Sequence, residues 1–495
     1  MASNSRVIRL LVSSMLLTAV ATPSAQKAQP SKLIAPPAGT MTEASIRGHM
    51  EFLASDAMNG RGSGTADEWR TAEYIASNLR RWGLEPMGDD GGYVQKIATG
   101  RMSAAAPPLL AAGPMTLTHG REMLVTNINK GAVKGPLFRY TFGAKAPAGS
   151  FVFVPDGVTV DNALTDGAAA VLTIETPQQR TSWAATGARL PTAAAGGGRG
   201  GGAPAPPAVR IALDKTTHAA IAGLADGTVL DFQMTMQPGY TWNAAGRLTG
   251  TDPKQKDDVI LLGAHLDHVG NRPGAPGADA IYNGADDDAS GVTAVMELAE
   301  ALSKSPRGKR TIVFGFFGSE ESGGAGANHF VTKPVIPLDK IKAMLQFEML
   351  GRPDPLVPPN TLWLTGYERS NLGVELAKQG AKLVQDPHPD QSFFTRSDNI
   401  RFAYEGVISH TVSSFNLHKD YHQASDEVKT IDFPYMTASI RSMYAPVVWL
   451  ANSTFVPTWY EGCKPVRGAG RGAPPPAASA TQGAAAPTPC KANGK

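Results

Sequence analysis

Residues that could bind a metal or move a proton follow several apolar runs of this sequence, each at the point where the run ends. They are His265 after Val259–Leu262, the pair Glu320 and Glu321 after Thr311–Phe317, and Glu348 after Ala343–Phe347. A fourth run, Val407–Val412, leads into a loop with His418, Tyr421 and His422. Because the carboxyl ends of parallel strands meet at one edge of a sheet, these side chains are expected to converge there.

Carboxylates and neutral imidazoles are ligands that zinc accepts together. Any one such residue alone would be an ordinary polar group, but several of them at successive strand ends indicate a metal centre. The candidate ligands are His265, Asp287, Glu321, Glu348 and His422. A carboxylate shared between two metals about 3.5–4 Å apart is typical of hydrolytic sites.

Two further acids, Glu320 and Asp267, are candidates for supporting roles. Glu320 is adjacent to the candidate ligand Glu321, and the two side chains leave a strand in different directions, so one can bind metal while the other faces a metal-bound water. Asp267, two residues after His265, is placed to accept the second ring N–H of that histidine.

The order of the expected strands and helices predicts an α/β fold. It should contain a mostly parallel mixed sheet flanked by helices and a small β-rich inserted domain. Helical spacing is expected over Ile46–Leu53, Thr71–Leu84, Val292–Leu302, Leu372–Leu383 and Tyr435–Leu450. The glycines of 60–64 are expected to form a flexible connector.

The predicted domain order follows changes in composition along the chain. Segments 41–104 and 246–458 are expected to form one discontinuous catalytic domain. Short β-like runs between glycine and proline turns predict an insert over 105–245, with a low-complexity loop at 193–208 and a low-complexity tail at 459–495.

The N-terminus resembles a secretory signal, predicted over residues 1–25. Arginines precede the apolar run Leu10–Ala21, which is too short to span a bilayer, and small residues follow. An exported protein without a transmembrane segment in its mature chain is therefore expected. In that compartment Cys463 and Cys490, the 2 cysteines of the chain, could form a disulfide. A net charge of +3 without a long basic run argues against nucleic acid as a partner.

Six stretches resemble, in order, the motifs of the family-28 zinc metallopeptidases of clan MH. That family includes secreted bacterial aminopeptidases, glutamate carboxypeptidase II and, more distantly, glutaminyl cyclases. The stretches are HLDH, NGADDDASG, FGSEESGGAGA, QFEMLGR, SDNIRFAYEGV and DYHQASD. The insert, with TDGAAAVLTIE, resembles the protease-associated domain often found within such enzymes.

The resemblance implies two zinc ions per chain, with Asp287 as the bridging ligand. His265 and Glu348 would complete one zinc site, and Glu321 and His422 the other. The resemblance also implies that Glu320 is the general base and that Tyr421 stabilises the oxyanion.

One position departs from the family pattern, since many members have aspartate where this chain has Glu348. Glutamate is one methylene longer, so a single-zinc enzyme similar to glutaminyl cyclases stays an alternative. A carboxypeptidase or dipeptidase is a further alternative, and a non-catalytic binding protein on this fold is disfavoured because no ligand is missing.

The function expected from these motifs is that of an exported zinc exopeptidase, specifically an aminopeptidase acting on peptides. A zinc-bound hydroxide generated by Glu320 would attack the scissile carbonyl. The surplus of acids would attract a substrate ammonium group, whereas Arg396 in the pocket would favour a substrate carboxylate. Neither side-chain preference nor oligomeric state follows from the sequence.

Overall fold

The computed structural model describes residues 34–128, 131–187, 191–194, 209–272 and 279–467. The predicted signal peptide, most of the low-complexity loop 193–208 and most of the tail lie outside these residues. Among the described helices, none combines the length and the apolar character that crossing a membrane requires.

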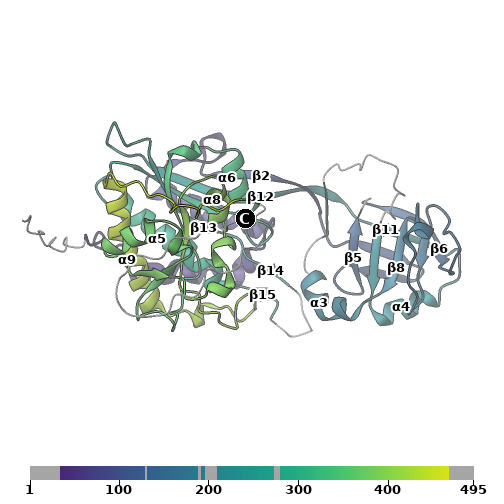
Figure 1. The fold of residues 1–495 in the computed structure, drawn as a ribbon. Helices are drawn as coiled ribbons and strands as arrows, with labels where there is room; N and C mark the ends of the chain where they lie inside the picture. Colours follow the sequence, from purple (N-terminus) through teal and green to yellow (C-terminus); the bar gives the residue numbers. More distant parts are fainter. Residues whose placement is uncertain (1–33, 129–130, 188–190, 195–208, 273–278, 468–495) are drawn as a thin grey trace, which may run out of the picture. The chain divides into compact units, whose positions relative to one another are not determined.

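The predicted α/β fold is confirmed by a 10-stranded mixed sheet with helices on both faces (Figure 1). Its order is β19-β18-β20-β17-β13-β16-β12-β2-β9, with β1 beside β12. The centre, β16-β13-β17-β20, is parallel, and the pairs of β12 with β16, β2 and β1 are antiparallel. The strands are β1 (Glu85–Pro86), β2 (Val94–Ala104), β9 (Thr192–Ala194), β12 (Met236–Leu248), β13 (Val259–His265), β16 (Thr311–Phe317), β17 (Ile341–Phe347), β18 (Leu362–Leu364), β19 (Leu383–Gln385) and β20 (Ser409–Ser413).

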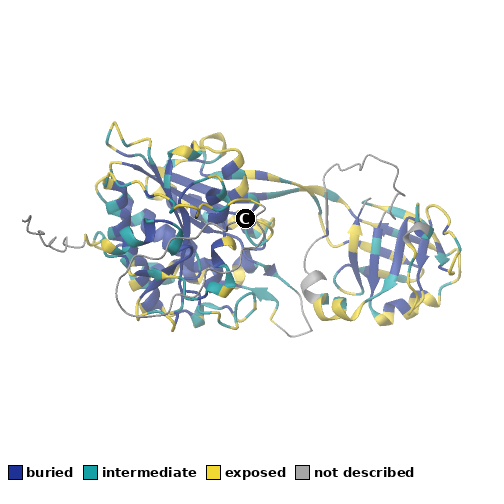
Figure 2. Cartoon of the chain, viewed as in Figure 1, coloured by how far each residue is buried: buried dark blue, intermediate teal, exposed yellow. Residues whose placement is uncertain are grey.

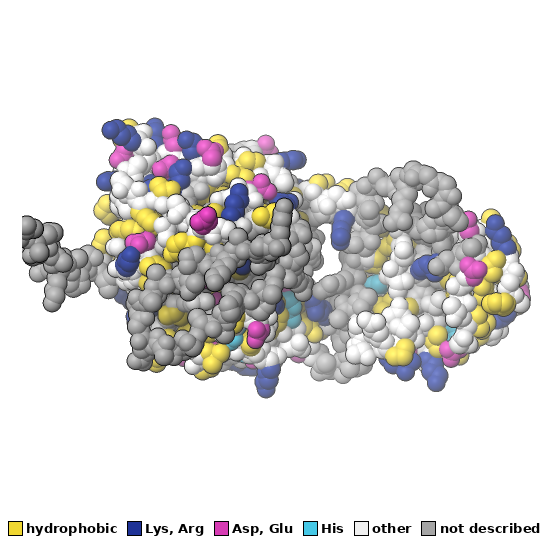
Figure 3. All heavy atoms as spheres, viewed as in Figure 1, with side chains coloured by type: hydrophobic (Ala, Val, Ile, Leu, Met, Phe, Trp, Pro, Cys, Tyr) yellow, Lys and Arg dark blue, Asp and Glu magenta, His cyan; other side chains and the backbone are white. Residues whose placement is uncertain are grey.

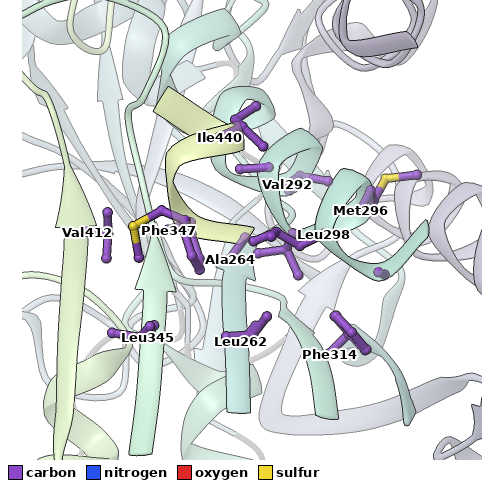
Figure 4. Packing of buried hydrophobic residues seen from close by; sticks show 14 of the residues in the cluster. Leu262, Ala264, Val292, Met296, Leu298, Phe314, Leu345, Phe347, Val412 and Ile440 are labelled. Carbon is purple, nitrogen blue, oxygen red and sulfur yellow. The ribbon is translucent and has the colours of Figure 1, made fainter. Parts of the chain in front are cut away.

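Alternate residues of the central strands pack on opposite faces, which explains why these strands are almost wholly apolar. Leu262 and Ala264 face one helical layer together with Phe314 and Leu345 (Figure 4). Leu261 faces the other layer. The first layer holds α1 (Glu43–Leu53), α2 (Ala66–Arg81), α5 (Gly291–Ser303), α7 (Leu372–Lys378) and α9 (Phe433–Asn452), and the second holds α6 (Ala325–Thr332) and α8 (Asn399–Tyr404).

One expected helix is shorter than its sequence pattern indicated. α7 ends at Lys378, and Leu383 begins β19 instead of ending the helix. Gly380 between them has φ 97°, in the left-handed region where glycine is favoured and where helices commonly end.

A second sheet of 8 strands forms the β-rich insert, with the order β4-β3-β11-β6-β7-β8-β10-β5 and its own buried core (Figure 2). The expected boundary at residue 245 falls inside β12, which pairs with both β2 and β16. The strands are β3 (Leu109–Ala112), β4 (Met115–Thr118), β5 (Met123–Ile128), β6 (Val133–Arg139), β7 (Phe151–Phe153), β8 (Ala170–Ile174), β10 (Val209–Leu213) and β11 (Val229–Gln233), with helices α3 (Pro177–Gly187) and α4 (Lys215–Ala222).

Residues 459–467 of the predicted tail contact segments that flank the 10-stranded sheet. Trp459 bridges to Ser370, and its indole N–H donates to the Gly406 carbonyl at 3.2 Å. Cys463 is buried and disulfide-bonded, while Cys490 lies outside the described residues. On the face drawn in Figure 3, basic and acidic side chains are interspersed among apolar ones.

Candidate metal centre

Neighbouring parallel strands deliver the predicted residues to one edge of the sheet. β16, β13 and β17 lie side by side, so His265 at the end of β13 meets the segments that follow the other two. Those segments carry Glu320, Glu321 and Glu348. The convergence at a carboxyl edge is the one that open α/β sheets use for ligands.

The turn η4 (Ala285–Ser290) separates the roles of its three aspartates. Asp286 accepts the backbone N–H of Gly351 at 2.7 Å, and Asp288 accepts that of Met349 at 3.2 Å. Both flanking carboxylates therefore hold the segment after β17. Asp287 turns its carboxylate toward His265 and His422, whereas Asp286 contacts only His418 among the histidines of the described residues, at 3.0 Å.

The carboxylate of Asp287 faces a different histidine through each of its oxygens. His265 Nε2 lies 3.2 Å from Oδ1, and His422 Nε2 lies 3.1 Å from Oδ2. Asp287 is 2 % exposed, so its two oxygens lie between the imidazoles rather than in solvent. This geometry suits a carboxylate shared between two cations.

One side of Asp287 carries a compact group of possible ligands. Glu321 Oε1 is 2.9 Å from His422 Nε2 and 3.0 Å from Nδ1 of His268. One atom each of His268, Asp287, Glu321 and His422 lie within 4.8 Å of one another. His268 was not among the residues predicted from the sequence, although it is the last letter of the HLDH motif.

The other oxygen of Asp287 faces His265. The Nδ1–H of His265 donates to the backbone carbonyl of Asp267 at 3.1 Å, so Nε2 is the ring atom that would bind a metal once the ring is neutral. Glu348 is half-buried, and its Oε2 is buried without a hydrogen-bond partner. His265 therefore contacts the Asp287 oxygen that does not face His422, and the charge of Glu348 acts on both His265 and Asp287.

The carboxylate of Asp267 does not take the position expected for it. Its Oδ1 is 3.9 Å from His265 Nδ1, and the backbone carbonyl of the same residue accepts the ring proton instead. The carboxylate accepts the backbone N–H of Glu320 at 3.0 Å and the hydroxyl of Ser63. Asp267 thus orients the segment that carries the candidate base.

Glu320 lies in a setting that favours its protonated form. Burial raises its pKa well above the ordinary range, and the nearby Asp398 and Glu348 raise it further, while His265 opposes them. Asp398 is itself buried with neither carboxylate oxygen hydrogen-bonded, and burial raises its pKa to about 7. An acid with a raised pKa beside candidate ligands is suited to proton transfer.

The charges of the site call for a cation. Burial alone would raise the pKa of Glu321, but His268 and His422 hold it at about 2. Burial alone would lower the pKa of His422, but Asp287 and Glu321 raise it to about 9. Without a metal, protonated imidazoles supply the positive charge that these acids require, and a bound dication would replace those protons.

A pocket with an empty volume of about 380 Å³ opens beside Glu348. Met349, Trp363, Phe393 and Phe415 form a buried apolar cluster in its wall. The remaining lining residues are Thr365, Arg396, Ser397, Thr411, Ser413 and Tyr421.

Tyr421 and Arg396 both reach this pocket. The ring of Tyr421 stacks on His422, with centroids 3.9 Å apart. The Arg396 guanidinium lies 5.0 Å from the Phe393 ring and is solvent-exposed.

The glycine-rich segment 60–64 is not the flexible connector expected from its composition. Arg61 is 1 % exposed and donates to the carbonyls of Leu53, Asn283 and Gly284 at 2.6, 2.7 and 2.9 Å. This guanidinium ties the N-terminal segment to the loop before η4. The arginine between two glycines was the only sequence signal for that role.

Comparison with known proteins finds a family match over the part of the chain that carries these residues. The model of Peptidase family M28 matches residues 243–445, which hold every candidate ligand. Residues 243–445 thus resemble peptidase family M28, over less than half of the chain. The predicted family resemblance is therefore confirmed for this M28 domain, while the resemblance of the insert to a protease-associated domain stays a prediction.

Two curated relatives share part of the chain. A probable lipoprotein aminopeptidase, LpqL, of Mycobacterium tuberculosis is 27% identical over 243 residues, covering 46% of this chain and 45% of that protein. Leupeptin-inactivating enzyme 1 of Streptomyces exfoliatus is 33% identical over 130 residues, covering 26% of each. The chain thus spans less than half the length of either relative.

A solved structure shares the fold. A zinc aminopeptidase from Bacillus subtilis superposes with a TM-score of 0.52 at 16% identity, covering 86% of this chain and 98% of that one. At this identity the likeness shows a shared fold and no more.

Proposed function

We propose that this chain is an exported zinc exopeptidase, and specifically an aminopeptidase. The observation that carries the proposal is the carboxylate of Asp287, whose two oxygens face His265 and His422 at 3.2 and 3.1 Å. The family match and the relative called a probable lipoprotein aminopeptidase support a peptidase. Export is proposed from the signal-like N-terminus.

The donor set fits two zinc ions. Glu321 Oε1 and Glu348 Oε2 are buried oxygens without hydrogen-bond partners, as expected of atoms reserved for a metal. Asp287 would bridge, with Glu321 and His422 on one side and His265 and Glu348 on the other. Bound zinc would polarise the scissile carbonyl and make water a stronger nucleophile.

The protein's own groups would then carry the proton and position the substrate. Glu320 takes a proton from the attacking water and returns it to the leaving amine. Asp267 holds the backbone of Glu320 in place through the bond at 3.0 Å. Tyr421, at the border of the pocket, can donate its hydroxyl to the oxygen on which charge develops.

The pocket and the surrounding charges favour a free N-terminus. The apolar wall of Trp363, Phe393 and Phe415 suits an apolar side chain on the residue that is removed. The acids of the site outnumber the charges of two dications, and the surplus attracts a substrate ammonium group. The exposed Arg396 is the opposing feature, because a guanidinium can bind a terminal carboxylate.

Comparing one peptide with its blocked forms tests the polarity of cleavage. The peptide should carry an N-terminal leucine, and the two other forms should be acetylated at the N-terminus or amidated at the C-terminus. Cleavage by the zinc-loaded protein should survive amidation and cease on acetylation. The reverse pattern would establish a carboxypeptidase.

A further inference from the structure

His268 is a buried histidine with no role in the scheme above. Its side chain is fully buried, and neither ring nitrogen has a hydrogen-bond partner. Nδ1 nevertheless lies 3.0 Å from Glu321 Oε1 and 3.7 Å from Asp287 Oδ2. A fully buried imidazole in this state is unusual, because buried polar groups are normally satisfied.

Four of the six distances within the compact group are close to the edge length of a zinc coordination tetrahedron. With bonds of about 2.0–2.1 Å, the ligand atoms of tetrahedral zinc lie roughly 3.3 Å apart. The distances from His268 Nδ1 to Glu321 and Asp287 are 3.0 and 3.7 Å, and those from His422 Nε2 are 2.9 and 3.1 Å. These atoms therefore surround a position that one small cation would fill.

The direction of the contact also points to a shared centre. In a tetrahedron, the axis from a ligand to the metal deviates by roughly 35° from the line to a neighbouring ligand atom. The contact of His268 Nδ1 with Glu321 Oε1 is short but lacks hydrogen-bond geometry, and both atoms are without partners. Lone pairs aimed at one point between the atoms account for both facts.

The position of His268 is set by the backbone around it. Its N–H donates to the Arg61 carbonyl at 3.0 Å, and its own carbonyl accepts from Ser63 at 3.3 Å. Its ring lies against Gly284, where a Cβ would come within 2.5 Å of the imidazole. The loop of residues 61–63 and Gly284 thus hold Nδ1 toward the group.

We propose that His268 is the fourth protein ligand of the metal bound by Asp287, Glu321 and His422. This inference rests on the proposed zinc enzyme. Four protein ligands close a tetrahedral site, whereas catalytic zinc keeps a position open. The closed site binds its zinc more tightly, and the site of His265 and Glu348 is the open one that admits water and substrate.

Two isosteric substitutions separate a ligand from a hydrogen-bond donor. His268→Asn places an amide N–H near the position of Nδ1, so it can donate to Glu321 but binds zinc poorly. His268→Asp places a carboxylate oxygen there, so it can bind zinc but cannot donate. His418→Gln is the control, since His418 contacts Asp286 at 3.0 Å and lies outside the group.

The measurement is zinc binding to the full chain, by chelator competition and elemental analysis, with circular dichroism as a check of folding. His268→Asn should weaken the tighter site by at least about 10-fold, the lower bound for losing a residue that supports a metal site. His268→Asp and His418→Gln should stay within a few-fold of the wild-type protein. Cobalt-substituted wild-type protein should show the intense visible bands of tetrahedral Co²⁺, and the His268→Asn variant should lose them.

The possible outcomes distinguish this inference from the proposed function. If His268→Asn binds zinc like the wild-type protein, or His268→Asp alone loses it, His268 is a donor to Glu321 and the inference is wrong. A wild-type protein that binds two zincs and cleaves peptides would keep the proposed function in that case. If His268→Asn loses zinc and the zinc-loaded wild-type protein cleaves no peptide, His268 is supported as a ligand and the proposed function is wrong.

Discussion

Asp267 accepts the backbone N–H of Glu320 at 3.0 Å, and this bond joins the segments that follow β13 and β16 at the candidate metal centre. Asp267→Ala should remove the acceptor while leaving the backbone carbonyl that holds His265 in place. We expect zinc content to be retained and kcat to fall by about 10–100-fold, as for other residues that orient a metal site. Ser63→Ala, which removes the contact to the other oxygen, should reduce kcat less. Full activity of Asp267→Ala would contradict this role.

Glu320→Gln keeps the size of the side chain but cannot accept a proton. Turnover should fall by about 10²–10⁴-fold, the usual contribution of a positioned general base. Zinc content should stay unchanged, because Glu320 is not among the proposed ligands. A variant with near-normal turnover would show that another group, with Asp398 the first candidate, takes the proton.

Metal stoichiometry tests the shared carboxylate. Asp287→Asn should lose both zincs, since each carboxylate oxygen faces a different histidine. Glu348→Ala should lose the zinc beside His265 and keep the one held by Glu321 and His422. Elemental analysis after dialysis measures both, and a full zinc complement in Asp287→Asn would refute the bridging assignment.

Arg396 separates the two polarities of exopeptidase. Its side chain is exposed at the pocket and lies over the Phe393 ring. Cleavage from a free N-terminus should therefore not depend on Arg396. Arg396→Ala should leave kcat/KM for an amidated peptide within about a few-fold of the wild-type value, as for other exposed substitutions. Phe393→Ala should raise KM for leucine peptides, because it removes part of the apolar wall that would contact the leucine side chain. A large loss confined to peptides with a free C-terminus would assign Arg396 to carboxylate binding.

Glu297 on α5 gives a pH dependence that is independent of the metal centre. Burial raises its pKa from 4.5 to about 7, although it accepts the N–H of Met41 at 2.9 Å. Between those values the folded protein binds the proton and the unfolded chain does not, so stability falls as pH rises from about 4.5 to 7.

Glu297→Gln should remove this loss, because glutamine stays neutral. The difference in Tm between this variant and the wild-type protein should therefore increase from pH 4 to pH 8 in favour of the variant. Calorimetry on metal-free protein measures it. Glu375→Gln, at the exposed ion pair with Lys378, is the control and should show little pH dependence. A difference in Tm that is constant with pH would contradict the raised pKa.

The central strands, and the positions of the candidate ligands that follow them, were predictable because local pattern determines both. β16 is the predicted run Thr311–Phe317, and β13 and β17 contain theirs, since strands buried on both faces are apolar throughout. A polar residue directly after such a run lies at the sheet edge whatever follows it in the chain. Asp287 follows no strand of the sheet, and its bridging role was assigned through the motif resemblance.

His268 and Arg61 could not be predicted in the same way, because distant segments decide where their side chains lie. His268 faces Glu321 only because Gly284 and the loop 61–63 confine its ring. Arg61 reads as part of a flexible glycine segment until its acceptors, the carbonyls of Asn283 and Gly284, are known. Contacts over such sequence separations leave no periodic signal.

The buried Arg61 has a consequence for proteolysis of this chain. A cut between Arg61 and Glu68 would release the guanidinium that fixes the loop at Gly284, and the carboxylate that accepts the Ser319 N–H at 2.7 Å. We therefore expect a cut there to loosen the candidate metal centre, and a fragment beginning at residue 243, where the family match begins, would lack both supports.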